Sequence, residues 1–325
     1  MNIARPSRFR RIYVLAAVMC ATTCLPATLL VACGAEHRAA DAPSLPRQPS
    51  AMPAGAPPDA SVAAGSAATA AATRGAHRSS GAADRDQYRH PVETLAFFGL
   101  TPTMTVLDVG PGAGYYTELL APVLAKDGLY IATNSEPPST PPEPSTSSWG
   151  PYAGVQFDAM LRASPAVYGK VQVVRVDYEK PKLSLDGKVD MVLLMREVHM
   201  MKNWGTLDVW LREIHRTLKP NGILGVEDHR AAPGTSPPGY LPEAWVVEKF
   251  ESAGFRLAGK SEINANPRDT KDYPNGVWSL PPSFYAGPLN SPHPAGEADR
   301  AKYAAIGESD RMTLKFVRVA DGAAR

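Results

Sequence analysis

The residues best suited to binding chemistry form a glycine-rich turn, in the segment Val106-Leu107-Asp108-Val109-Gly110-Pro111-Gly112-Ala113-Gly114-Tyr115. Glycine accepts positive φ and has no Cβ, so a ligand can lie against main-chain N–H groups. A helical pattern starts directly after the turn, and the unpaired N–H groups at a helix N-terminus favour a negatively charged group there. The segment therefore predicts a cradle for a nucleotide-type ligand.

The spacing of this turn differs from that of a dinucleotide-binding turn. The dinucleotide pattern is G-x-G-x-x-G, whose last glycine allows close helix packing. Here Gly110, Gly112 and Gly114 alternate, the bulky Tyr115 follows, and Asp108 precedes them. This pattern resembles motif I of class I S-adenosylmethionine (SAM) dependent methyltransferases. The resemblance implies SAM as cofactor, with the glycines under its methionine end and Asp108 holding its amino group. The alternatives are a NAD-type oxidoreductase, against which Tyr115 argues, and a tight turn without a ligand.

The region around the turn predicts an α/β domain. Short apolar runs typical of buried parallel strands alternate with helical patterns. These runs are Thr105–Val109, Leu129–Thr133, Val171–Val176, Val189–Leu194 and Ile223–Glu227. Such alternation implies a parallel sheet, and ligands bind beyond the carboxyl ends of its strands.

The carboxyl-terminal part of the domain has a different pattern. A helix-like segment at 242–253 precedes two strand-like segments, 255–263 and 312–319, which are separated by a long Pro-, Asn- and Gly-rich excursion. The class I resemblance implies that these last two strands form a hairpin. We therefore expect a Rossmann-like, mostly parallel seven-stranded sheet with one antiparallel strand and helices on both faces.

Polar residues that end the second and third strands are candidates for binding the adenosine. Nucleotide-binding sheets commonly end their second strand in an acid that accepts hydrogen bonds from the ribose hydroxyls, whereas this chain has Asn134 there and Glu136 two residues on. An uncharged amide predicts weaker ribose binding. Asp177 is placed to meet the adenine amino group, with Tyr178 beside it, although an aspartate there also suits a turn cap.

In this fold the acceptor-side groups come from the loops after the fourth and fifth strands. Those loops contain His199 and His229, and either is a candidate base for the acceptor because histidine titrates near neutral pH. Glu197 and Asp228 are candidates to orient an imidazole. The alternative is that each of these residues has no catalytic role and is simply exposed or salt-bridged.

The same two loops contain arginines that could bind an anion. Arg196 or Arg230 could hold the SAM carboxylate or an acidic acceptor. A metal bound by His199, Asp228 and His229 is the less favoured alternative, because there is no i, i+4 histidine pair or cysteine ligand. We expect no metal.

Several further segments resemble a family of predicted exported bacterial methyltransferases. They are Arg89-His90-Pro91-x-Glu93-Thr94-Leu95-x-Phe97-Phe98-Gly99, Asp228-His229-Arg230, Asn266-Pro267-x-Asp269 and Ser309-Asp310-Arg311. Arg89 and His90 could form a lid over the cofactor, or they could begin a helix that packs Leu95, Phe97 and Phe98 onto the sheet.

The first 33 residues have the pattern of a bacterial lipoprotein signal peptide. Four arginines precede a long apolar run, which ends in Leu30-Val31-Ala32-Cys33-Gly34. This end resembles a lipobox, so we expect Cys33 to be lipidated and the protein to be periplasmic and anchored to the bacterial membrane. The alternative is an uncleaved transmembrane helix.

The chain is expected to divide into a signal peptide (1–33), a disordered tether rich in Ala, Pro and Ser (34–85) and a methyltransferase-like domain (86–325). The tether has no apolar period with which to bury surface. All three cysteines lie before residue 34, so the domain lacks a thiol for a disulfide or a metal.

With a net charge of +2 and no basic stripe, the sequence predicts no nucleic-acid partner. The expected function is methylation of a small or envelope-associated acceptor. The alternative is a binding or scaffolding module that keeps the fold without catalysis.

Overall fold

The computed structural model describes residues 59–140, 142, 150–287 and 293–320. The expected signal peptide with Cys33 and the first part of the expected tether lie outside these residues. Within the described part of the chain, no helix has both the length and the apolar character needed to cross a membrane.

A seven-stranded sheet forms the centre of the domain, with strand order β3-β2-β1-β4-β5-β9-β6. Neighbouring strands from β3 to β5 are parallel, whereas β9 pairs antiparallel with both β5 and β6. The strands are β1 Thr105–Val109, β2 Leu129–Asn134, β3 Gln172–Arg175, β4 Val189–Met195, β5 Leu218–His229, β6 Phe255–Ser261 and β9 Arg311–Arg318. The expected sheet, with its one antiparallel strand, is confirmed.

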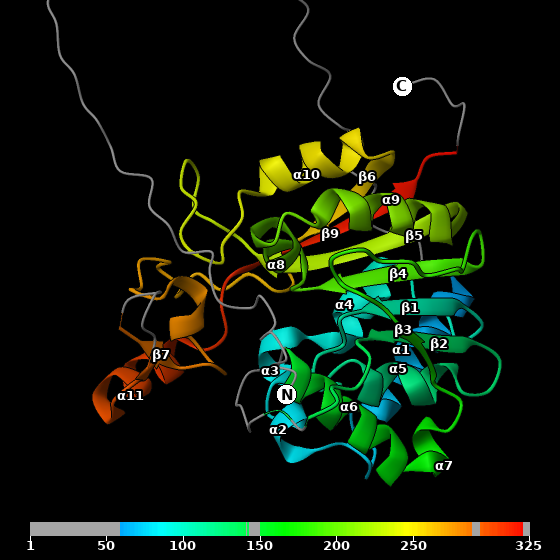
Figure 1. Ribbon diagram of the computed structural model, residues 1–325, viewed down its shortest axis with the longest axis horizontal. Coiled ribbons are helices and arrows are strands. Elements are labelled where there is room, and N and C mark those ends of the chain that lie inside the picture. The colour runs from blue at the N-terminus through cyan, green and yellow to red at the C-terminus, as the bar shows by residue number, and fades with distance from the viewer. Residues whose placement is uncertain (1–58, 141, 143–149, 288–292, 321–325) are drawn as a thin grey trace, which may run out of the picture. The chain divides into compact units, whose positions relative to one another are not determined.

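Helices cover both faces of this sheet (Figure 1). Those of the described residues are α1 Ala60–Ala72, α2 Ser80–Ala83, α3 Asp86–Arg89, α4 Pro91–Phe98, α5 Thr117–Leu124, α6 Pro151–Ala163, α7 Pro165–Tyr168, α8 Val198–Asn203, α9 Leu207–Thr217, α10 Glu243–Ser252 and α11 Glu297–Ile306. Strand side chains alternate between the faces: Leu107 packs with α9 and α10, whereas Val106 packs with α4 and α5. The two resulting cores fix the sheet between its helices.

The stretch before residue 86 departs from the sequence prediction. Residues 60–72 form α1, whose Ala72 is buried in the same core as Leu95 and Phe98 of α4. Gly65 of α1 lies so close to α4's end that an added Cβ would be 2.1 Å from the carbonyl oxygen of Leu100. The prediction of a disordered tether is therefore wrong for residues 59–85. Alanine has the highest helix propensity, and small side chains allow close helix packing without an apolar period.

The long excursion between β6 and β9 returns to the carboxyl ends of the parallel strands. It contains a short 3₁₀ helix, η1 Gly276–Ser279, and a two-stranded pair, β7 Tyr285–Ala286 and β8 His293–Pro294. Figure 1 shows β7 and α11 beyond that end of the sheet. The excursion therefore supplies one wall of the site described next.

Candidate functional site

The glycine turn after β1 has the backbone that its sequence predicts. Gly110, Gly112 and Gly114 have φ values of 69°, 58° and 98°. These are left-handed values that favour glycine. An added Cβ on Gly110 would lie 2.5 Å from the carboxyl carbon of Glu197. At Gly110, therefore, both the positive φ and the nearby Glu197 side chain disfavour a residue with a Cβ.

Two side chains support the turn from β2 and from the loop after β3. The N–H of Gly110 donates to Thr133 Oγ1 at 2.9 Å, and the Tyr178 hydroxyl is 2.9 Å from the same oxygen. The Tyr178 ring packs against Trp210 of α9, at 5.4 Å between ring centroids. Tyr178 is thus positioned to hold Thr133 under the turn.

Two buried carboxyl groups flank the same turn. Asp108 is 1% exposed and accepts a hydrogen bond from the Tyr130 hydroxyl at 2.9 Å. Burial raises the pKa of Asp108 to about 7, although this hydrogen bond opposes the rise. Burial also raises the pKa of Glu197 well above its usual range; Arg196 opposes that shift, and the charges of Asp228 and Asp108 add to it.

One of these carboxyl groups has an atom without a partner. Glu197 Oε2 is buried and accepts no hydrogen bond from the described residues. A buried acceptor without a donor is costly, and a positively charged ligand group would relieve it. Asp108 and Glu197 together therefore suit an ammonium group lying against the glycine turn.

A cavity of about 160 Å³ opens from the turn toward the ends of β4 and β5. A single water needs only about 10–15 Å³, so the cavity can admit part of a ligand. Its walls come from α3, the glycine turn, the β4 and β5 loops and the excursion. The residues lining it are Arg85, Arg89, Asp108, Gly110, Pro111, Gly112, Ala113, Tyr115, Tyr116, Met195, Arg196, Glu197, His199, Met200, His229, Val277, Trp278, Pro281, Pro282 and Ser283.

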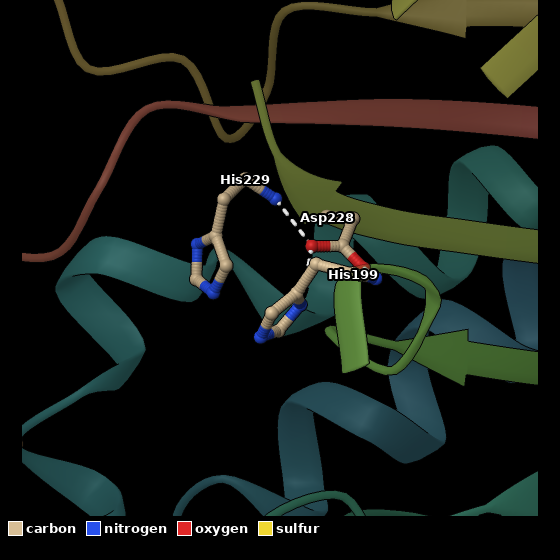
Figure 2. Close-up of side chains that lie close together, drawn as sticks. All are labelled: His199, Asp228 and His229. Atoms are coloured by element: carbon tan, nitrogen blue, oxygen red, sulfur yellow. Dashed lines mark hydrogen bonds and ion pairs between the residues drawn. The ribbon is translucent and has the colours of Figure 1, made fainter. Parts of the chain in front are cut away.

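At the far side of this cavity, His199 and Asp228 form a buried pair (Figure 2). His199 Nδ1 lies 2.9 Å from Asp228 Oδ1, and the His199 N–H donates to Asp228 Oδ2 at 3.1 Å. Asp228 thus fixes both the ring and the main chain of His199. Among the described residues the other ring nitrogen, Nε2, has no hydrogen-bond partner, and His199 lines the cavity, an arrangement suited to general-base catalysis.

His229 lies beside this pair but has different partners. Its ring is 4.8 Å from that of His199, between centroids, and its Nδ1 is 2.6 Å from Ser309 Oγ. Burial and then the charges of His199 and Arg196 lower the pKa of His229 well below its usual range. His229 is therefore neutral near pH 7 and serves as a hydrogen-bonding group.

His199, Asp228 and His229 also have ligand-type atoms within 4.8 Å of one another. However, Asp228 Oδ1 already accepts from the His229 N–H at 2.7 Å and contacts His199 Nδ1. These contacts describe a carboxylate that orients its neighbours. The expectation that no metal binds stays a prediction.

The structure does not bring Asn134 and Asp177 to the cavity. The Asn134 amide nitrogen donates to the Gly154 carbonyl and to Asp158 Oδ1 of α6, both at 3.0 Å. Its Oδ1, the atom expected to accept from ribose, accepts from the Ser135 N–H at 2.9 Å. Asp177 is exposed and accepts a hydrogen bond from the Glu179 N–H at 2.9 Å. It therefore acts as a turn cap, the alternative that the sequence left open.

Two expected roles in the β4 and β5 loops change. Glu197 lies against the glycine turn, and Asp228 alone orients an imidazole. Arg230 pairs with Asp310 at 2.9 Å and with Glu262 at 2.7 Å, and these hydrogen bonds raise its pKa. Arg230 is thus a structural residue with no donor facing the cavity, and of the two arginines only Arg196 lines it.

Several cavity residues were not identified as site residues from sequence. Arg85 and the excursion residues Trp278, Pro281 and Pro282 have no local pattern that marks them, because only the folded chain brings them to the strand ends. Arg89 was noted only as a possible lid. In the structure it lines the cavity, while α4 behind it packs Leu95 on the sheet. The packing role suggested for this segment is therefore confirmed, whereas a lid over the cofactor stays a prediction.

A sheet of this order, with a glycine turn after its first strand, defines a Rossmann-like nucleotide-binding fold. The family model described as a methyltransferase domain matches residues 82–257, which is more than half of the chain. The chain therefore belongs to this methyltransferase family, and the expected enzyme class is confirmed.

Similar solved structures include a SAM-dependent methyltransferase from Aquifex aeolicus, with 20% identity, a TM-score of 0.46 and coverage of 73% of this chain and 93% of that one. The glycopeptide N-methyltransferase MtfA has 13% identity, a TM-score of 0.44 and coverage of 72% and 95%. An arsenic(III) SAM methyltransferase from Chlamydomonas reinhardtii has 14% identity, a TM-score of 0.40 and coverage of 69% and 65%. No curated protein matches the sequence.

Proposed function

We propose that this protein is a SAM-dependent methyltransferase whose base is His199. The main supporting observation is that one cavity is lined both by the glycine turn and by His199. Asp108 and Glu197 suit the ammonium group of the cofactor's methionine end, and the bare turn would lie under that end. SAM, when bound, supplies a methyl group on a sulfonium.

The residues of this chain position the acceptor and accept its proton. His199 lines the cavity, and Asp228 holds its ring through Nδ1 at 2.9 Å, which leaves Nε2 to accept the proton. A proton taken up at Nε2 gives an imidazolium beside the Asp228 carboxylate, which stabilises it. Trp278 lies 6.1 Å from the His199 ring, between centroids, and covers it from the excursion.

To test this, we would supply methyl-labelled SAM to the full-length protein with a panel of small hydroxyl, amine and thiol compounds. With an accepted compound, His199→Gln should lower kcat by about 10²–10⁴-fold, and S-adenosylhomocysteine affinity should stay unchanged. Asp228→Asn should give a smaller loss. Equal turnover by wild type and His199→Gln would remove His199 from the mechanism.

The second candidate function is a binding module without catalysis. One observation favours it: Asn134 lacks a charge, and its amide is already bonded to α6. The same labelled-SAM experiment separates the two, because a module would bind S-adenosylhomocysteine but transfer no label to any compound. The family assignment leaves the NAD-type oxidoreductase without support.

We further propose that the enzyme acts in the bacterial cell envelope as a periplasmic lipoprotein, on a small or envelope-associated acceptor. The support is the arginine-rich start, the apolar run and the Leu30-Val31-Ala32-Cys33 motif. Cys33→Ala should abolish lipid attachment and move the protein from the membrane fraction. Mass spectrometry of the mature protein provides the measurement, and residues before Cys33 on that protein would contradict the proposal.

A further inference from the structure

Three arginines line the cavity, from two different parts of the chain. Arg85 directly precedes α3, Arg89 is its last residue, and Arg196 follows β4 directly. Arg89 is 2% exposed and lies over the Tyr115 ring, with 4.4 Å from its guanidinium carbon to the ring centroid. The Arg89 side chain is thus held in place by packing and projects little into bulk solvent.

Arg85 and Arg89 share a single carboxylate. Arg85 Nε is 2.6 Å from Glu308 Oε1, and Arg89 Nε is 3.0 Å from Glu308 Oε2. Arg311 Nη1 is also 3.0 Å from Glu308 Oε2. Burial would raise the pKa of Glu308, but Arg89, Arg85 and Arg311 outweigh it and hold the pKa well below its usual range.

Sharing one carboxylate leaves donors without acceptors. The Nη2 atoms of Arg85 and Arg89 are buried and have no hydrogen-bond partner among the described residues. A buried donor without an acceptor is unfavourable, and more so when it is charged. The fold therefore keeps two unsatisfied guanidinium ends at the wall of a cavity.

Arg196 adds a third guanidinium with no acceptor. Within the described part of the chain, no hydrogen bond or ion pair of its side chain is found. Burial, followed by the charges of Arg89 and Arg85, lowers the pKa of Arg196 to about 9. Its backbone is held at a φ of 66°, which is uncommon for a residue with a Cβ. Backbone of this kind is strained, and such residues cluster at binding sites.

The charges of these arginines and of their carboxylate partners do not balance. Arg85, Arg89, Arg196 and Arg311 provide four positive charges, and their carboxylate partners are Glu308 and Glu227, the latter 2.7 Å from Arg311. Two positive charges remain. Asp108 and Glu197 lie at the glycine turn, where they would face the ammonium group of the cofactor instead of these arginines. The single carboxylate of SAM could offset one of the two remaining charges, which leaves one for a second anion.

We propose that Arg85, Arg89 and Arg196 form an oxyanion subsite for a carboxylate or phosphate group on the methyl acceptor. This inference rests on the proposed function, and it specifies the acceptor as an anionic molecule. Guanidinium groups match the geometry of such anions. Arg196 is three residues before His199, so an acceptor bound here would have its nucleophile near the base.

Inorganic phosphate is a suitable probe, titrated by calorimetry at constant ionic strength into full-length protein saturated with S-adenosylhomocysteine. We expect phosphate to bind, and Arg196→Gln to weaken this binding by about tenfold, equivalent to about 1.4 kcal/mol. Arg212→Gln is the matched control, because Arg212 is exposed and outside the cavity, and it should bind phosphate as wild type does. Arg196→Gly, which suits the positive φ, should reproduce the loss without straining the backbone.

Three results would overturn the subsite: no phosphate binding, equal binding by wild type and Arg196→Gln, or phosphate binding only when S-adenosylhomocysteine is absent. The last would assign the arginines to the cofactor carboxylate. If S-adenosylhomocysteine itself fails to bind, the proposed function fails. Phosphate titration of the free protein would still test the subsite.

Discussion

At the residue scale, the site depends on the carboxyl groups of Asp108 and Glu197, whose ionisation is opposed by burial. Asp108 sits under the glycine turn and Glu197 against it, and burial raises the pKa of each. Such groups destabilise the empty protein when they ionise, yet an ionised carboxylate is what holds an ammonium group. When ionised, these two carboxylates therefore lower the stability of the empty protein and favour binding of the ligand's ammonium group.

Asp108 should give opposite pH dependences for binding and stability. Its pKa of about 7 in the folded chain lies above the unfolded value, so ionised Asp108 costs stability, increasingly as pH rises from about 4 to about 7. Asp108→Asn should therefore raise Tm at pH 8. The same change should weaken S-adenosylhomocysteine binding at pH 8, because it removes the charge.

In wild type, the affinity for S-adenosylhomocysteine should decrease as the pH drops below 7, by up to about tenfold per pH unit, because one proton neutralises Asp108. Glu197→Gln is the control that keeps the Asp108 titration. Calorimetry measures this affinity between about pH 5.5 and about pH 8, which lie about one to two units either side of the pKa. Equal affinity across this range would contradict the role of Asp108.

At the element scale, the strands were predictable and α1 was not. Thr105–Val109 is a strand with the bounds that its apolar run predicts, and Leu207, Trp210 and Ile214 lie on the buried face of α9 as their spacing predicts. An alanine-rich helix has no such period. Its stability comes from close contact between small residues and α4, which only the folded chain shows.

Gly65→Ala tests whether α1 is part of the domain. In an exposed helix this change stabilises by about 0.5–1 kcal/mol. Here the added Cβ would lie 2.1 Å from the Leu100 carbonyl oxygen, so we expect a loss of about 1–3 kcal/mol and a lower Tm.

Gly81→Ala in α2 is the matched control, because its Cβ would meet nothing within 4 Å. Differential scanning calorimetry of the two variants beside wild type is decisive. A Tm for Gly65→Ala at or above that of Gly81→Ala would show that α1 is not packed as described.

At the scale of the whole molecule, the site is assembled from segments far apart in the sequence. The glycine turn and the His199 and Asp228 loops were predictable, because parallel strands place their carboxyl ends together. Arg85, Trp278 and Glu308 were not, because the sequence gives no rule for how α3 and the excursion return to that edge. The glycine turn and the strand-end loops were thus foreseeable, and the wall that α3 and the excursion supply was not.

The central claim is that the turn at Gly110 binds the cofactor in the cavity that contains His199. Titration of S-adenosylhomocysteine into wild type and Gly110→Ala by calorimetry tests it most directly. We predict binding by wild type and loss of at least about tenfold affinity in Gly110→Ala, because the new Cβ would clash with Glu197 and with the ligand's place on the turn. Undiminished binding by Gly110→Ala, or no binding by wild type, would contradict the claim.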